Sequence, residues 1–166
     1  MNGKKNNKSP AVIKTKILVV DDHPIVRDGL AMLINCETDL AVIARAGNAA
    51  GAVRAVKKHP IDLAIVDMLF KDTTGVQVTR QIKTICPYLI VLMFSMSDKT
   101  LHIQQAFEAG AKGYIIKEEL SEKIIYAIRR VLKGETYLSR RLSKMFTRRQ
   151  LSELLNRDGN HTQNKG

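Results

Sequence analysis

The stretch KILVVD, residues 16–21, is an aliphatic run, partly β-branched, that ends in an acidic residue. Four comparable runs follow it along the chain: LAVIARA at 40–46, DLAIVD at 62–67, LIVLMFS at 89–95 and GYIIK at 113–117. Continuous apolar runs of this kind are typical of strands that are buried on both faces of a parallel sheet. The first run and its repetition therefore predict an α/β fold.

Segments with helical spacing separate and follow these five predicted strands. The first begins at Pro24, and proline favours the first position of a helix. Gly110 and Gly134 lie just beyond two later segments, where glycine commonly ends a helix. Helices are predicted over five segments, which are residues 24–34, 48–58, 76–85, 98–109 and 124–132. Regular alternation of five strands with five helices predicts parallel pairing and a doubly wound sheet.

The positive charge of the chain is concentrated at its two ends. The formal net charge is +11, of which residues 1–16 carry +5, residues 139–166 carry +5 and residues 17–138 only +1. Basic tails can attract polyanions or can simply be solvated ends, and both interpretations stay open. No apolar run approaches the roughly 20 residues of a membrane span, and no apolar segment follows the basic N-terminus as in a secretory signal. We therefore expect a cytoplasmic protein.

Cysteine and histidine residues give no sign of a metal or disulfide framework. Cys36 and Cys86 lie far apart in mainly apolar surroundings, which predicts two reduced and buried thiols. The histidines show no zinc-ligand spacing with each other or with the cysteines.

Side chains capable of chemistry stand where successive predicted strands end. The first strand ends in Asp21 and Asp22 and the third in Asp67, while the fourth and fifth end in Ser95 and Lys117. Each residue alone could be a helix cap, a turn residue or a solvated charge. Together, converging carboxylates attract a hard divalent cation such as Mg²⁺, and a hydroxyl and an ammonium suit phosphoryl transfer.

The motifs that surround these residues resemble one family over residues 15–135. They are ILVVDDHPIVRDGL (17–30), Asp67 with Gly75 eight residues later, VLMFS (91–95) and AGAKGYIIK (109–117). This combination resembles the receiver domain of two-component response regulators, in the NarL/FixJ (LuxR-type) branch. The resemblance implies a flavodoxin-like (CheY-like) fold with a five-stranded parallel sheet of order 2-1-3-4-5 and five flanking helices.

The resemblance also implies a metal site and a phosphoacceptor. Asp67 would be the phosphoacceptor, with its carboxylate as nucleophile. Asp22 and Asp67 would bind Mg²⁺ directly, Leu69 would offer its backbone carbonyl, and Asp21 would act through a water molecule. The expected donor is a sensor histidine kinase or a phosphotransfer protein. No catalysis is expected beyond phosphoryl acceptance and self-dephosphorylation.

Further residues match the family's signalling switch. Ser95 would be the hydroxyl that hydrogen-bonds the phosphoryl group, Lys117 would contact that group, and Tyr114 would be the aromatic switch. One position departs from the pattern, because Lys71 stands where receivers usually carry proline. The loop therefore lacks a fixed φ angle. Apolar Leu69 beside the site predicts slow self-dephosphorylation, because it cannot guide an attacking water.

The chain is predicted to divide into four parts: a basic disordered tail (1–14), a receiver (15–135), a linker helix with the partial start of an output domain (136–156) and a disordered tail (157–166). Thr147 is expected to cap a helix in the third part. The 28 residues after Leu138 leave no room for the complete DNA-binding domain of the branch. A natural truncation and a fragment of a longer regulator both stay open.

The sequence suggests four functions. The preferred one is a phosphorelay switch that dimerises on phosphorylation and regulates transcription, with DNA contacted only through an output domain. A stand-alone receiver that acts by protein–protein interaction is the alternative. A Mg²⁺-dependent phosphatase with an aspartate nucleophile is disfavoured, because Leu69 occupies the position of its general acid. Direct DNA binding through the tails would be weak and salt-sensitive.

Overall fold

The computed structural model describes residues 13–156, except for the side chains of residues 120–122. The predicted disordered tails lie outside this range, apart from residues 13 and 14. The strands are β1 (Thr15–Val20), β2 (Leu40–Ala46), β3 (Leu63–Asp67), β4 (Ile90–Ser95), β5 (Gly113–Ile116) and β6 (Tyr137–Leu138). The helices are α1 (Pro24–Asn35), α2 (Ala49–Lys58), α3 (Gly75–Ile85), α4 (Thr100–Glu108), α5 (Leu120–Leu132), α6 (Arg140–Ser143) and α7 (Arg148–Leu155), with a 3₁₀ turn, η1, at Lys117–Glu119.

All strands are parallel, and their order is β2-β1-β3-β4-β5-β6. The α/β class, the CheY-like topology and the order of the first five strands are thereby confirmed. The prediction of only five strands and five helices was wrong. Strand β6 pairs with β5 through two residues, and such a short segment carries no periodicity that a sequence pattern could show. Helices α6 and α7 follow it.

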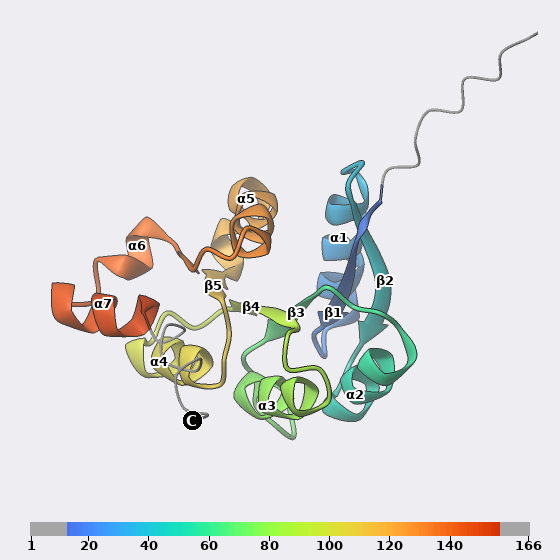
Figure 1. Ribbon diagram of the computed structural model, residues 1–166, viewed down its shortest axis with the longest axis horizontal. Coiled ribbons are helices and arrows are strands. Elements are labelled where there is room, and N and C mark those ends of the chain that lie inside the picture. The colour runs from blue at the N-terminus through green and yellow to red at the C-terminus, as the bar shows by residue number, and fades with distance from the viewer. Residues whose placement is uncertain (1–12, 157–166) are drawn as a thin grey trace, which may run out of the picture.

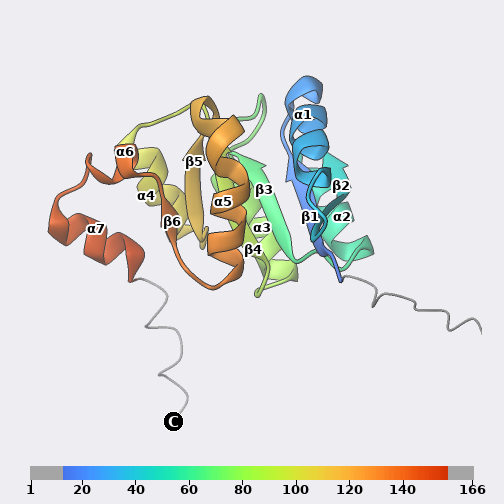
Figure 2. The same ribbon diagram turned by 90° about the horizontal axis from the view of Figure 1, so that it is seen from above.

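Two layers of helices enclose the sheet (Figures 1 and 2). Helices α1 and α5 cover one face, where Leu30 and Ile128 belong to one buried cluster. Helices α2, α3 and α4 cover the other face. Leu142 of α6, Phe146 of the link between α6 and α7, and Leu154 of α7 also belong to this second cluster. The C-terminal segment is therefore packed against the same core as α2, α3 and α4.

Local capping explains where several helices begin. Thr74 starts α3 and Thr147 starts α7, and both form a capping box with a glutamine three residues later. The predicted cap at Thr147 is confirmed. The prediction of two buried cysteines was wrong for Cys36, which is exposed at the end of α1, while Cys86 is partly buried. The apolar residues around Cys36 in the sequence do not show that its own side chain, at the end of α1, faces solvent.

Candidate functional site

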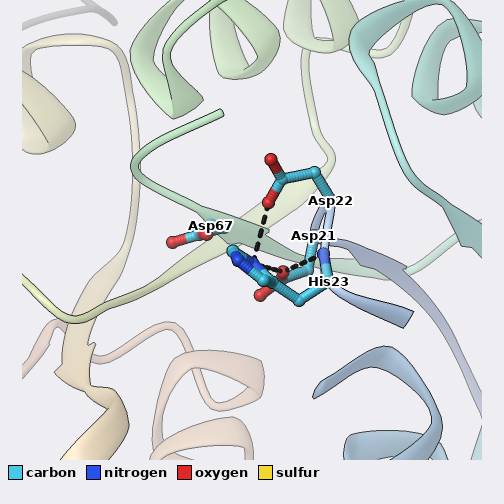
Figure 3. A group of neighbouring side chains, drawn as sticks. All are labelled: Asp21, Asp22, His23 and Asp67. Atoms are coloured by element: carbon cyan, nitrogen blue, oxygen red, sulfur yellow. Dashed lines mark hydrogen bonds and ion pairs between the residues drawn. The ribbon is translucent and has the colours of Figure 1, made fainter. Parts of the chain in front are cut away.

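Three carboxylates meet at the carboxyl ends of β1 and β3, which are neighbours in the sheet. Asp21 and Asp22 directly follow β1, and Asp67 is the last residue of β3. Figure 3 shows their side chains gathered at this edge. Asp21 and Asp67 are 1% and 4% exposed. Burial of two acidic groups side by side is costly, so each needs a partner.

Lys117 supplies that partner from the end of β5. Its Nζ donates to Asp21 Oδ2 at 2.6 Å and to Asp67 Oδ2 at 2.9 Å. The same ammonium lies 5.4 Å from the centroid of the Phe94 ring. The lysine side chain is only 10% exposed, so these are buried ion pairs. One ammonium therefore joins two carboxylates from different strands.

The protonation of Asp67 reflects competition between burial and this lysine. Desolvation by burial is the largest effect and raises the pKa of Asp67, and the charge of Asp21 raises it further. The hydrogen bond and charge of Lys117 oppose that rise, and so does the Met68 N–H, which donates to Asp67 Oδ1 at 2.7 Å. An additional cation at the site would favour the ionised form of Asp67.

His23 is a member of this cluster that the sequence did not single out. Its backbone N–H donates to Asp21 Oδ1 at 2.8 Å, and its ring Nδ1 lies 3.1 Å from the same oxygen and 2.9 Å from Asp22 Oδ1. Arg27 donates to the backbone carbonyl of Asp21. The segment after β1 is thus held in place by its own side chains. The sequence did contain a sign that His23 belongs to the site, because this histidine directly follows two aspartates at a strand end.

The donor set fits a divalent cation. Asp21, Asp22, His23 and Asp67 each offer an atom, and these atoms lie within 4.8 Å of one another. Asp22 Oδ1 is buried without a hydrogen-bond partner among the residues that the structure describes, since its approach to His23 lacks hydrogen-bond geometry. Three carboxylates against one lysine leave negative charge to neutralise. Mg²⁺ prefers carboxylate oxygens of this kind.

The loop after β3 passes close to the backbone of Asp67, which explains Gly75. A Cβ at Gly75 would lie 2.0 Å from the carbonyl oxygen of Asp67 and 2.6 Å from Met93 Cε. The Gly75 N–H donates to the Met68 carbonyl at 2.8 Å. Leu69, which bridges to Thr74, is 48% exposed beside the site.

Ser95 and Tyr114 form a second polar group next to the carboxylates. Ser95 is fully buried at the end of β4, and its Oγ accepts the backbone N–H of Ser97 at 3.0 Å. The Tyr114 hydroxyl donates to the Ser97 carbonyl at 2.7 Å. Burial, the largest cause, raises the pKa of Tyr114 to about 12. The ring is fully buried, so it faces inward.

Comparison with known proteins decides the family. A family model for the response regulator receiver domain matches residues 17–129. The chain belongs to this family. A crystal structure of a two-component response regulator of the LuxR family from Aurantimonas sp. SI85-9A1 is 31% identical, with a TM-score of 0.76 over 84% of this chain and 96% of that chain. The receiver therefore belongs to the NarL/LuxR branch.

Two further relatives bear on this receiver. The signal receiver domain of NarL from Mycobacterium tuberculosis is 28% identical, with a TM-score of 0.69 over 74% of this chain and 98% of that domain. The oxygen regulatory protein NreC of Staphylococcus haemolyticus is 34% identical over 129 residues. That match covers 77% of this chain and 59% of NreC, so the chain spans about three-fifths of that relative.

The structure brings together the residues that the sequence placed at the strand ends. Asp21, Asp22, Asp67 and Lys117 share one site, and Ser95 lies at the same edge of the receiver. Their roles in phosphoryl transfer stay proposals. No described helix of this receiver is long and apolar enough to cross a membrane.

Proposed function

We propose that this receiver accepts a phosphoryl group on Asp67 from a phosphohistidine of a sensor histidine kinase or a phosphotransfer protein. The double hydrogen bond of Lys117 to Asp21 and Asp67 carries the proposal. It positions the Asp67 carboxylate at the sheet edge beside an ammonium that can pair with a phosphoryl oxygen. In the transfer, an oxygen of Asp67 attacks phosphorus and forms an acyl phosphate. The phosphorus–nitrogen bond breaks, and the histidine nitrogen keeps the electron pair and takes up a proton.

Magnesium is the proposed cofactor. Asp22 and Asp67 would hold it directly, Leu69 through its backbone carbonyl, and Asp21 through water. When bound, the ion supplies positive charge that offsets the charge of the carboxylates and of the incoming phosphoryl group. The buried Oδ1 of Asp22, which accepts no hydrogen bond among the described residues and has the His23 ring nitrogen 2.9 Å away, supports this assignment.

The remaining polar residues act on the phosphoryl group and on the signal. Lys117 would pair with a phosphoryl oxygen, and the Ser95 hydroxyl would donate to another. Half-exposed Leu69 offers no group to guide a hydrolytic water, so self-dephosphorylation should be slow. A half-life of only seconds would contradict this. Tyr114 would report the state of Ser95 to the surface formed by α4, β5 and α5.

The proposed output is a change of interactions in the cytoplasm. Phosphorylation adds roughly −1.5 to −2 charges at this site, enough to shift a two-state element. Dimerisation on phosphorylation would serve transcriptional regulation, with DNA contacted through an output domain. Action as a stand-alone receiver through protein–protein contacts is the alternative. Size-exclusion chromatography with and without beryllofluoride distinguishes a phosphorylation-driven dimer from a monomer.

Intact-mass spectrometry tests the proposal. The chain is incubated with acetyl phosphate and Mg²⁺, beside an Asp67→Asn variant and a sample with excess EDTA. We expect the mass of one phosphoryl group on the unaltered chain with Mg²⁺, and none on the variant or in EDTA. An Asp67→Asn variant that gains the same mass would refute the assignment of Asp67.

A further inference from the structure

Arg141 of α6 joins two loops that flank the proposed phosphorylation site. Its Nη1 donates to Glu118 Oε2 at 2.9 Å and its Nη2 to Asp98 Oδ2 at 3.4 Å. Asp98 stands three residues after Ser95, and Glu118 directly follows Lys117. A single guanidinium thus contacts the β4–α4 loop and η1, the two segments next to the proposed phosphoryl-contacting side chains.

The backbone around Arg141 is fixed to the receiver. Leu138 pairs with Tyr114 in the parallel β5–β6 ladder. Ser139 is 2% exposed and caps α6 by accepting the Leu142 N–H at 3.3 Å. Leu142 is fully buried in the cluster that contains the α4 side chains. Figures 1 and 2 show α7, which follows α6, beside α4. The guanidinium therefore extends from an anchored segment and can restrain both loops.

The arrangement suits arginine in particular. The planar guanidinium presents several N–H donors in a fixed fork, so one side chain can bond two carboxylates at once. A lysine can also bond two carboxylates, as Lys117 does, but only from a single nitrogen. Arg141 instead uses two separate nitrogens for Glu118 and Asp98. Loop restraint matters for transfer of a phosphoryl group, because catalysis there consists largely of positioning groups and neutralising charge.

We infer that Arg141 is a positioning residue for phosphoryl acceptance: by tying Asp98 to Glu118 it holds the segments that present Ser95 and Lys117. This inference rests on the proposed function and extends it to the C-terminal segment. The segment that contains α6 would then influence phosphorylation directly. By linkage, occupation of the site also changes how tightly α6 is held.

The size of the effect follows from exposure. Arg141, Asp98 and Glu118 side chains are 53%, 50% and 60% exposed. Exposed ion pairs contribute little and are screened by salt, so we expect phosphorylation of an Arg141→Gln variant to be slower by roughly two- to five-fold at low salt. The difference should shrink as ionic strength approaches about 1 M, where the screening length is short.

The experiment combines two readouts on the full chain. Hydrogen–deuterium exchange of peptides covering residues 96–99 and 117–119 is measured without phosphoryl donor. The rate of phosphorylation by acetyl phosphate with Mg²⁺ is measured at low and high salt. The variants are Arg141→Gln, Arg141→Lys and a matched control, Arg149→Gln, whose guanidinium pairs with Glu153 within α7.

We expect Arg141→Gln to raise exchange in both peptides and slow phosphorylation at low salt, Arg141→Lys to be intermediate, and Arg149→Gln to match the unaltered chain. Glu118→Gln should have no further effect in the Arg141→Gln background. Normal exchange and rate in Arg141→Gln would overturn the inference. If Arg141→Gln raises exchange but the unaltered chain accepts no phosphoryl group, the proposed function is overturned. The restraint of both loops by Arg141 is then still supported.

Discussion

At each end of the sheet one basic side chain pairs with two acidic ones, but the pairs are buried at one end and exposed at the other. At the carboxyl end, Lys117 pairs with two aspartates in ion pairs whose side chains are at most 10% exposed. At the amino end, Arg129 pairs with Glu37 and Asp39, and its side chain is 47% exposed. Desolvation makes the first arrangement costly and the second nearly neutral. This difference is consistent with the proposed phosphoryl transfer at the buried cluster, whereas the exposed ion pairs are solvated surface contacts.

The largest effect is expected from removing the buried cation at the carboxyl end of the sheet. Lys117→Met leaves Asp21 and Asp67 buried together without their shared cation, so in EDTA it should lower the free energy of unfolding by about 3–5 kcal/mol. Urea denaturation measures the change. Arg129→Met is the matched control at the amino end and should leave the urea midpoint unchanged. Equal losses in the two variants would remove the distinction between the ends.

Two glycine substitutions compare a crowded position at the carboxyl end of the sheet with an open position in α1. Gly75→Ala forces a Cβ against the Asp67 carbonyl and should cost about 1–3 kcal/mol of unfolding free energy. Gly29→Ala, within α1, meets no atom within 4 Å and should instead stabilise by about 0.5–1 kcal/mol. Chemical denaturation of both variants gives the comparison. A neutral Gly75→Ala would show that the loop after β3 can move away from Asp67.

Mg²⁺ should stabilise the folded protein only through ligands at the carboxyl end of the sheet. Mg²⁺ at ten times its dissociation constant should raise the free energy of unfolding by about 1.4 kcal/mol. Asp22→Asn should lose most of this gain, whereas Asp39→Asn, at the amino end, should keep it. Urea titrations with and without Mg²⁺ provide the test. A gain retained by Asp22→Asn would exclude that carboxylate as a ligand.

The smallest effect concerns the loop between Asp67 and α3. Lys71→Pro removes conformational freedom from the unfolded chain and should stabilise by about 0.4–1 kcal/mol. Lys71→Ala removes the charge without fixing φ and serves as the control, with no expected change. A loss of stability in Lys71→Pro, measured by urea denaturation, would show that the loop backbone is incompatible with proline.

The carboxyl-end site was predictable because a simple rule applies to it. In parallel sheets, strand ends meet at one edge, so the acids after KILVV and LAIV converge if their strands are neighbours, as the family resemblance implied. The chemistry-bearing residues at the ends of four strands could therefore be placed without knowledge of any distance. Each apolar run was long enough to locate its strand within one or two residues.

Other features depend on contacts that sequence patterns do not encode. Strand β6 is two residues long and is defined only by its pairing with β5. The packing of Leu142 and Leu154 against the receiver core, and the bridge from Arg141 to Asp98 and Glu118, join segments far apart in the chain. The approach of His23 to the carboxylates depends on local backbone geometry at the end of β1.

Locating the phosphoryl group tests the central claim most directly. After treatment with acetyl phosphate and Mg²⁺, borohydride reduces an acyl phosphate to the primary alcohol of homoserine, and proteolysis with tandem mass spectrometry locates the changed residue. The account predicts that homoserine replaces Asp67 and that no other aspartate is altered. Homoserine at Asp21 or Asp22, or its absence from a chain that carries phosphoryl mass, would contradict it.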